Sequence, residues 1–167
     1  MTARVASLLV GTLALVGGLW LVGRHPNTPP ATTFVAQPFP AIPALANVTQ
    51  PAILLTTWAS WCAVCMAELP QKIAYAQAHP RVALVAVNID TDSTKRAAVL
   101  ARLQAPPSTN VYWLNDPSRT LAFGTLQGTG VPESFVLNAQ RQLLFKQSGP
   151  LNLQGGKFAA ALAAAQR

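Results

Sequence analysis

Cysteine, histidine and acidic residues are scarce in this sequence of 167 residues. It contains two cysteines, Cys62 and Cys65, two histidines and five acidic residues. Two cysteines are too few for the network of crosslinks that holds a small disulfide-rich fold together. A four-ligand zinc site is not expected either, because neither His25 nor His79 has ligand spacing to the cysteines. The cysteine pair therefore needs another explanation.

Charged residues are also few, and their balance is basic. The 12 Lys and Arg residues outnumber the 5 Asp and Glu residues, which gives a net charge of +7. The basic residues are scattered, and their only adjacent pair is Lys95 and Arg96, so we expect a solvated basic surface and no nucleic-acid partner. With 51% hydrophobic residues, the chain is not disordered throughout, and its length suits one domain with a proper core.

The N-terminus carries one long hydrophobic run. Residues 5–23 contain no charged side chain, and a helix of that length rises about 28 Å, close to the hydrocarbon thickness of a bilayer. This run is longer than the apolar core usual in a cleaved signal peptide. We therefore expect residues 1–23 to be a signal anchor that crosses the membrane once. A weak cleavage-like sequence at residues 16–18 keeps a cleaved signal open as an alternative.

A proline-rich segment follows this run. Seven of the 14 prolines lie between residues 24 and 51, a composition typical of extended, semi-stiff chain. We interpret residues 24–36 as a spacer and residues 37–167 as the globular domain.

Within the domain, the hydrophobic pattern predicts strands that alternate with helices. Strands are expected at 52–58, 81–89, 110–116, 134–138 and 143–147, and helices at 62–78, from 92 or 93 to 104, at 117–126 and at 155–167. Asp90 and Asp92 fit helix capping better than a calcium loop, whose other ligands are missing. The alternation predicts an α/β fold with a central mixed sheet, because the last two strands should form an antiparallel edge.

The two cysteines stand in the segment TTWASWCAVCMAELP, residues 56–70, between a predicted strand and a predicted helix. The free N–H groups and the dipole at a helix start stabilise an anion, so the pKa of the Cys62 thiol should fall. Cys65 lies about one turn further along, within disulfide reach and more enclosed. The arrangement indicates an attacking thiol, Cys62, and a resolving thiol, Cys65, for thiol–disulfide exchange.

This segment resembles the membrane-anchored, thioredoxin-like reductases of the TlpA and ResA group. Residues 114–151 are more specifically similar to the DsbE/CcmG branch, which serves cytochrome c maturation and typically shows a Gly-x-Pro-Glu-Thr-Phe motif. The motif stands here as GVPESF, residues 130–135. The resemblance covers about residues 38–167 as well as the anchor. It implies a thioredoxin-like fold and a thiol–disulfide oxidoreductase with no cofactor besides the redox-active Cys62–Cys65 pair.

The resemblance also implies a substrate-binding surface. Pro132 is expected to be a cis-proline packed against the disulfide, which leaves the backbone of Val131 free to pair with an extended substrate chain. Trp61 is assigned to the same surface. The residues between the cysteines, Ala63 and Val64, depart from the proline-containing dipeptides found in such proteins and help set the reduction potential.

The group that accepts the proton of Cys65 is the main departure from thioredoxin. Thr56 stands six residues before Cys62, where thioredoxin has a buried acidic residue, so another group must act. Glu68 follows Cys65 by three residues on the same helix face, and Glu133 follows the predicted cis-proline. We therefore expect Glu68 and Glu133 to be catalytic acids, with Glu68 slightly favoured.

The expected function is periplasmic. The protein should be a single-pass protein of the bacterial inner membrane that reduces the haem-binding cysteine pair of apocytochrome c and is re-reduced by a thiol–disulfide electron donor in the membrane. No metal site is expected if the protein is such a reductase. The alternative is a copper-site assembly module, either a reductase or a Cu(I) chaperone, because Cys62, Cys65 and Met66 are soft donors. A scaffold used only for binding is weakly supported, because both cysteines are present.

Overall fold

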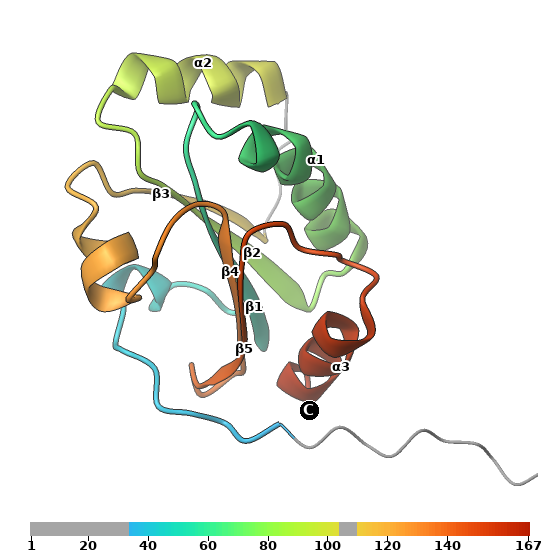
Figure 1. Cartoon of the computed structure of the whole chain (residues 1–167). Helices are drawn as coiled ribbons and strands as arrows, with labels where there is room; N and C mark the ends of the chain where they lie inside the picture. Colours follow the sequence, from blue (N-terminus) through green and yellow to red (C-terminus); the bar gives the residue numbers. More distant parts are fainter. Residues whose placement is uncertain (1–33, 104–109) are drawn as a thin grey trace, which may run out of the picture. The chain divides into compact units, whose positions relative to one another are not determined.

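A five-stranded mixed sheet forms the centre of the structure, a computed structural model that describes residues 34–103 and 110–167 (Figure 1). The strands are β1 (Ala52–Trp58), β2 (Val82–Asn88), β3 (Val111–Asn115), β4 (Glu133–Leu137) and β5 (Leu143–Ser148). They lie in the order β3-β2-β1-β4-β5. The first three run parallel, whereas β4 is antiparallel to β1 and β5 is antiparallel to β4. The predicted mixed sheet with an antiparallel edge is therefore confirmed.

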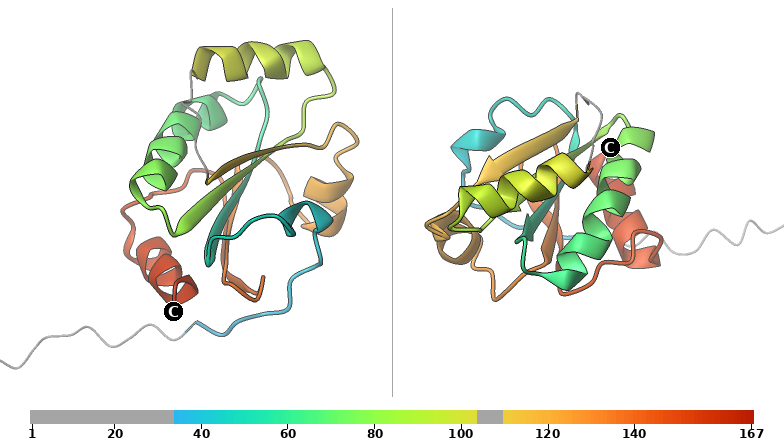
Figure 2. Two further views of the ribbon diagram at one scale, coloured as in Figure 1. Left: turned by 180° about the vertical axis from the view of Figure 1, so that it is seen from behind. Right: turned by 90° about the horizontal axis from the view of Figure 1, so that it is seen from above.

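Three α-helices flank this sheet. They are α1 (Ala63–Ala78), α2 (Ser93–Leu103) and α3 (Gly156–Ala165). Helices α1 and α3 lie on the same side of the sheet in both views of Figure 2. A 3-10 helix, η1 (Pro43–Leu45), was not predicted, and the helix predicted at 117–126 is a shorter π-helix, η2 (Thr120–Thr125). The seven other predicted strands and helices whose two ends lie within the described residues agree with the structure within one residue at the start and two residues at the end, the usual uncertainty of such boundaries.

The predicted membrane anchor, residues 1–23, and most of the predicted spacer, residues 24–36, lie outside the described residues. Phe34, near the end of that spacer, packs against the core. Within residues 34–103 and 110–167, no helix has both the length and the apolar character that a membrane crossing requires.

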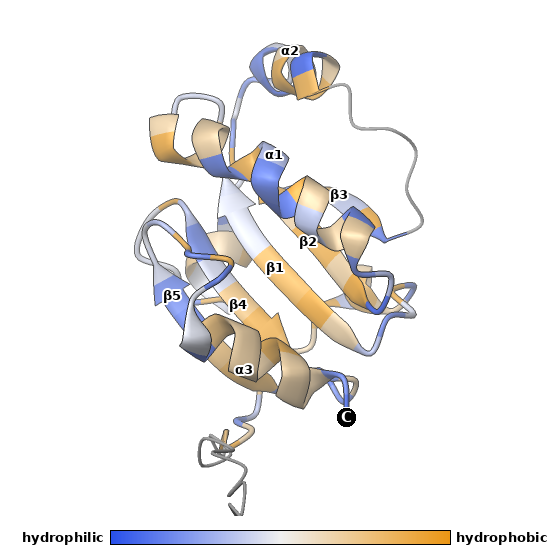
Figure 3. Cartoon of the chain, turned by 90° about the vertical axis from the view of Figure 1, so that its right-hand side faces the viewer, coloured by the Kyte–Doolittle hydropathy of each residue, from blue (hydrophilic) through white to orange (hydrophobic). Residues whose placement is uncertain are grey.

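Successive residues of the central strands face two different hydrophobic cores. In β1, Ala52, Leu54 and Trp58 belong to the core beneath α1 and α3, whereas Ile53 and Leu55 belong to the core on the opposite face. A strand buried on both faces consists of consecutive apolar residues, as the sequence shows for the parallel strands. The strand becomes polar only near its carboxyl end, at residues 56 and 57 (Figure 3). Both threonines there are buried, so their hydroxyl groups need partners inside the protein.

Helix α1 carries charge on the face that it buries. The buried residues recur every three or four positions and are Cys65, Glu68, Leu69, Lys72, Ile73 and Ala76. Glutamate and lysine are almost never fully buried unless they are paired. Since the helix begins directly after Cys62, this charged face lies next to the cysteine motif.

Candidate active site

Cys62 and Cys65 are joined by a disulfide at the N-terminus of α1, with the two sulfurs 2.10 Å apart. Cys62 is the N-cap residue, and its Sγ accepts the Cys65 N–H at 3.1 Å. The exposed fraction is 7% for Cys62 and 2% for Cys65. Cys62 is thus the sulfur nearer to solvent, and a thiolate there would receive an N–H group from the first turn of the helix, which favours the anion.

The loop between β1 and Cys62 is held by Asp90. The buried carboxylate of Asp90 accepts the backbone N–H of Ser60 at 2.9 Å, the hydroxyl of Ser60 at 3.0 Å and the side-chain amide of Asn88 at 2.8 Å. The prediction that Asp90 serves as a helix cap is therefore wrong. Asp92 alone caps α2, by accepting N–H groups of its first turn. Because Ser60 lies two residues before Cys62, Asp90 positions the active-site loop, a role that the sequence did not suggest.

The loop before β4 borders the more exposed sulfur. The peptide bond between Val131 and Pro132 is cis, as the resemblance implied. The Val131 carbonyl oxygen lies 3.6 Å from Cys62 Sγ. Trp61 and Val64 are large hydrophobic residues of the motif that remain 62% and 41% exposed. An exposed apolar surface therefore adjoins the disulfide, and the assignment of Trp61, Val131 and Pro132 to substrate binding stays a prediction.

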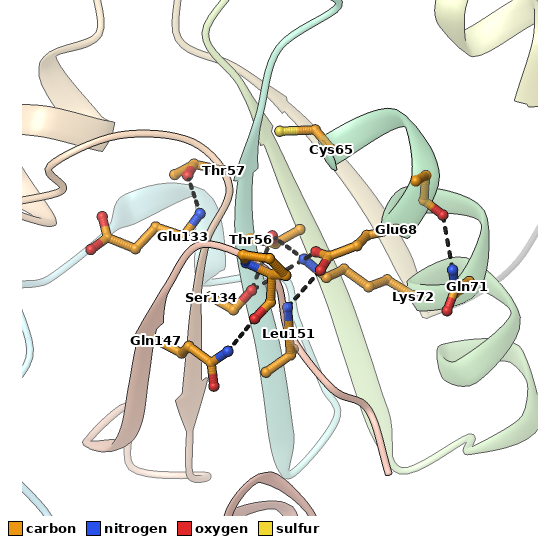
Figure 4. A network of polar contacts seen from close by, with 12 residues as sticks. Thr56, Thr57, Cys65, Glu68, Gln71, Lys72, Glu133, Ser134, Gln147 and Leu151 are labelled. Atoms are coloured by element: carbon orange, nitrogen blue, oxygen red, sulfur yellow. Dashed lines mark hydrogen bonds and ion pairs between the residues drawn. The ribbon is translucent and has the colours of Figure 1, made fainter. Parts of the chain in front are cut away.

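Beside the cysteines, Lys72 is a buried cation with three partners. Its ammonium group lies 2.8 Å from the carboxylate of Glu68 and donates to Thr56 Oγ1 at 3.0 Å and Ser134 Oγ at 3.2 Å (Figure 4). The other oxygen of Glu68 accepts the backbone N–H of Leu151 at 2.5 Å. Burial lowers the pKa of Lys72, and the hydrogen bond and charge of Glu68 oppose that shift without cancelling it. The lysine thus fills all three of its donor positions while it remains an electrostatic cost to the fold.

A small void connects Lys72 to the resolving cysteine. Its lining residues are Thr56, Thr57, Trp58, Cys65, Leu69, Lys72 and Pro132. The void offers no room for a water molecule. Glu68 is not among the lining residues, so of the two residues of the ion pair only Lys72 borders the space next to Cys65.

Glu133 lies on the other face of the sheet from this network. Alternation along β4 places Ser134 on the same face as Lys72 and turns the Glu133 side chain away (Figure 4). There its buried carboxylate accepts the hydroxyl of Ser148 at 2.7 Å and pairs with Lys146 at 3.3 Å. The structure therefore brings together the two cysteines, the cis-proline and Glu68 with its lysine, and it keeps the carboxylate of Glu133 apart. The proton-transfer roles of Glu68 and Glu133 stay predictions.

Lys72 was not recognised from the sequence as a site residue, although a signal for it exists. It stands on the helix face defined by Cys65 and Leu69, where the spacing calls for a hydrophobic residue. Glu68, four residues before it, is at the spacing of a helical ion pair. A lysine on the buried face of a helix, with an acidic residue four positions before it, therefore predicts a buried ion pair.

Met66 was considered as a third soft donor for copper beside the two cysteines. Met66 packs against the hydrophobic core and lines a shallow pocket with Val99, Arg102 and Leu103. In the part of the chain that the structure describes, no three His, Cys, Asp or Glu residues form a group that could hold a metal ion.

Two curated proteins are similar to this chain in sequence. A probable thiol:disulfide interchange protein DsbE-2 from Pasteurella multocida is 30% identical over 105 residues, which is 63% of this chain and 52% of that protein. The thiol:disulfide interchange protein DsbE from Allochromatium vinosum is 28% identical over 103 residues, which is 60% of this chain and 53% of that protein. The chain thus spans about half the length of these relatives. No protein-family model matches it.

Solved structures share the fold. A putative thiol:disulfide interchange protein DsbE from Chlorobium tepidum is 25% identical, with a TM-score of 0.55 over 81% of this chain and 94% of that chain. A thioredoxin-like protein in its oxidised form is 19% identical, with a TM-score of 0.60 over 78% of this chain and 97% of that chain. The protein therefore has a thioredoxin-like fold and is similar in sequence to the DsbE thiol:disulfide interchange proteins, which confirms these two parts of the resemblance, while the membrane anchor stays a prediction.

Proposed function

We propose that the protein is a thiol–disulfide oxidoreductase in which Cys62 attacks the substrate and Cys65 resolves the mixed disulfide. The observation that carries this proposal is the position of Cys62 Sγ at the start of α1, 3.1 Å from the Cys65 N–H, with Cys65 the more buried of the two. The similarity to DsbE proteins supports the same chemistry.

In the reducing direction, the Cys62 thiolate attacks one sulfur of a substrate disulfide and forms a mixed disulfide with it. The other substrate sulfur leaves as a thiolate and takes up a proton from water. Cys65 then gives up its proton and attacks Cys62 Sγ, which restores the Cys62–Cys65 disulfide and releases the second substrate thiol. Two electrons pass from the cysteine pair to the substrate, so the reaction needs no cofactor besides that pair. A second dithiol must then reduce the protein again.

The substrate proposed here is the oxidised haem-binding cysteine pair of apocytochrome c, and the proposed electron donor is a thiol–disulfide protein of the membrane. This finer assignment rests on the similarity of residues 130–135 to the DsbE/CcmG motif. The same proposal makes residues 1–23 an anchor in the bacterial inner membrane. The catalytic domain would then lie in the periplasm. Trp61 and the backbone of Val131 would hold an extended stretch of substrate beside Cys62, as in strand addition.

Trapping with a peptide disulfide tests the core of the proposal. A Cys65→Ala variant should form a stable mixed disulfide through Cys62 with an oxidised peptide that contains a Cys-x-x-Cys-His sequence. The matched Cys62→Ala variant should form none. Adducts that require Cys65 instead would reverse the two roles, and the absence of adducts with either variant would overturn the function.

The reduction potential of the Cys62–Cys65 pair tests the direction of electron flow. A value on the order of −270 mV, as in thioredoxin, supports a reductase, and a value near −120 mV indicates an oxidant. Tight Cu(I) binding by the reduced protein without any disulfide exchange would favour the copper-site alternative.

A further inference from the structure

Lys72 has no part in the exchange reaction as written above, yet its charge is buried close to the reacting pair. A lysine that is 2% exposed keeps a cation out of water, which is unfavourable even when the cation is paired. A hydrophobic side chain of similar length would fill the same place without that cost. The packing of α1 alone therefore does not explain why a charged residue stands here.

The position of the charge relative to Cys65 suggests what it does. Lys72 and Cys65 line the same void, and the remaining lining includes the apolar residues Trp58, Leu69 and Pro132. Because this space holds no water, a charge at Lys72 acts on Cys65 across dry protein and is screened far less than through solvent.

The ion pair also has a direction. Glu68 is held on its far side by the backbone N–H of Leu151, whereas the ammonium group of Lys72 is fixed by the hydroxyl groups of Thr56 and Ser134. Only the lysine adjoins the void beside Cys65. Of the two charged residues, Lys72 therefore borders the space next to the resolving cysteine, and Glu68 does not.

We propose that the ammonium group of Lys72 stabilises the thiolate of Cys65 that forms while Cys62 is held in a mixed disulfide with substrate. This inference rests on the proposed function and adds an electrostatic positioning residue to it. Lys72 forms no bond and exchanges no electrons. The Cys65 sulfur bonds to Cys62 Sγ, the bond from Cys62 to the substrate breaks, and the proton of Cys65 ends on the departing substrate sulfur.

The effect on the thiol follows from elementary electrostatics. Burial in apolar surroundings raises the pKa of a thiol, because the thiolate loses its hydration. A nearby cation favours the thiolate and offsets that rise. Cys65 is the more deeply buried cysteine, so it is the one that needs such compensation before it can attack.

A structural role for Lys72 predicts a different result. The residue joins α1 to β1 through Thr56 and to β4 through Ser134, so its loss is expected to lower stability whether or not it affects Cys65. A pKa measured on the folded protein separates the two roles, since a purely structural residue leaves the pKa of Cys65 unchanged.

The experiment uses the full chain with Cys62→Ser, which leaves Cys65 as the single thiol of the protein. The pKa of Cys65 is obtained from the rate of alkylation by iodoacetamide as a function of pH. In this background, Lys72→Met should raise the pKa by about one unit or more, and alkylation near neutral pH should slow about tenfold. Glu68→Gln should change the pKa in the opposite direction, because it removes the charge that counteracts the lysine.

Two further variants complete the design. Lys72→Met also leaves Glu68 unpaired, and that charge alone would disfavour a thiolate. The double variant Lys72→Met with Glu68→Gln removes this contribution and the risk of misfolding from an unpaired buried charge. It should still raise the pKa of Cys65. Lys157→Met, which removes an exposed lysine of α3, is the matched control and should leave the pKa unchanged.

An unchanged or lowered pKa of Cys65 in the folded double variant overturns the role of Lys72. A pKa that does not fall in Glu68→Gln overturns it as well. Both measurements follow a single thiol and need no turnover. A protein that traps no substrate but shows these shifts would therefore refute the proposed function while it upholds the electrostatic effect of Lys72.

Discussion

The carboxylates of Glu68 and Glu133 lie on opposite faces of the sheet, and each is paired with a lysine of its own. The sequence favours Glu68 only slightly over Glu133, since both acids lie close to a motif of the active site. In the structure only Glu68 shares a face with the network beside Cys65. The two residues are therefore expected to respond differently to the same substitution.

Glu133→Gln should lower stability without changing the pKa of Cys65. The carboxylate is 1% exposed and is bound by Ser148, Lys146 and the N–H of Thr129. Loss of its charge should reduce the free energy of unfolding by about 1–3 kcal/mol, because buried partners lose an ionised acceptor. Urea unfolding measures the stability and iodoacetamide alkylation measures the thiol, with Glu68→Gln as the comparison. A shift of the Cys65 pKa in Glu133→Gln would show that both faces of the sheet act on the thiol.

The lowered pKa of Lys72 should give the protein a specific alkaline stability profile. In the unfolded chain the lysine titrates near 10.5, and burial lowers this value in the folded protein. Between the folded pKa and the unfolded pKa of Lys72, the unfolded state binds more protons than the folded state, so the stability of the protein rises with pH. This gain in stability is lost again as the pH falls through the folded pKa. The charged groups that face Lys72 are Glu68, on its own helix, and the Cys65 thiol once it is reduced; Thr56 and Ser134 are neutral.

The double variant Lys72→Met with Glu68→Gln is the reference for this prediction, since it lacks the titrating lysine. Urea unfolding of the oxidised proteins, from neutral pH to above pH 10.5, should show the wild type gaining stability relative to that variant. Tyr75 also titrates in this range, because burial raises its pKa, but it is common to both proteins. A wild type that loses stability relative to the variant over this window would contradict the assignment.

The sheet and the cysteine motif could be predicted because each depends on local pattern. The parallel strands are continuous apolar runs, and the helix start at Cys62 follows from a motif placed between a strand and a helix. Met66 also lies where helical packing places it, against the core. Such features need only the periodicity of side chains and the chemistry of helix ends.

The network around Lys72 depends instead on long-range register. Thr56 pairs with Ser134 only because β1 and β4 are antiparallel neighbours with that alignment, and a shift by one residue would turn Ser134 to the other face. The same register places Glu133 on the opposite face. Asp90 is a similar case, because its bond to Ser60 joins the ends of two strands. Local patterns do not specify such contacts.

Asp90→Asn should disturb the loop that presents Cys62. Both carboxylate oxygens of Asp90 accept hydrogen bonds from Ser60, and one also accepts from Asn88. An asparagine places an NH₂ group against at least one of these donors, so the free energy of unfolding should fall by about 1–3 kcal/mol. The rate at which Cys62 of the Cys65→Ala variant is alkylated should change as well, because the loop no longer holds one geometry.

Asp92→Asn is the matched control for this substitution. It makes the same change of charge at the cap of α2, where asparagine caps a helix about as well as aspartate does. Stability and the alkylation rate of Cys62 should both stay near those of the parent protein. Equal effects of the two substitutions would mean that charge, rather than the Ser60 contacts, is responsible.

The last prediction concerns two glycines that precede the cis-proline. A Cβ on Gly128 would lie 2.6 Å from Glu133 Oε2 and 2.7 Å from the backbone oxygen of Ala122, whereas a Cβ on Gly130 would meet nothing within 4 Å. Gly128→Ala should therefore displace backbone and lower the free energy of unfolding by about 1–3 kcal/mol, the usual cost of overpacking. Gly130→Ala should leave stability unchanged or raise it by about 0.4–1 kcal/mol, because the unfolded chain loses freedom.

The segment that contains the two glycines leads to Val131, whose carbonyl lies 3.6 Å from Cys62 Sγ. Gly128→Ala in the Cys65→Ala background should therefore also slow the trapping of a peptide disulfide. Urea unfolding and the trapping rate, measured for both variants, check this. A Gly130→Ala variant that is as destabilised as Gly128→Ala would show that backbone freedom before Pro132, rather than the close approach to Glu133 and Ala122, is what the segment requires.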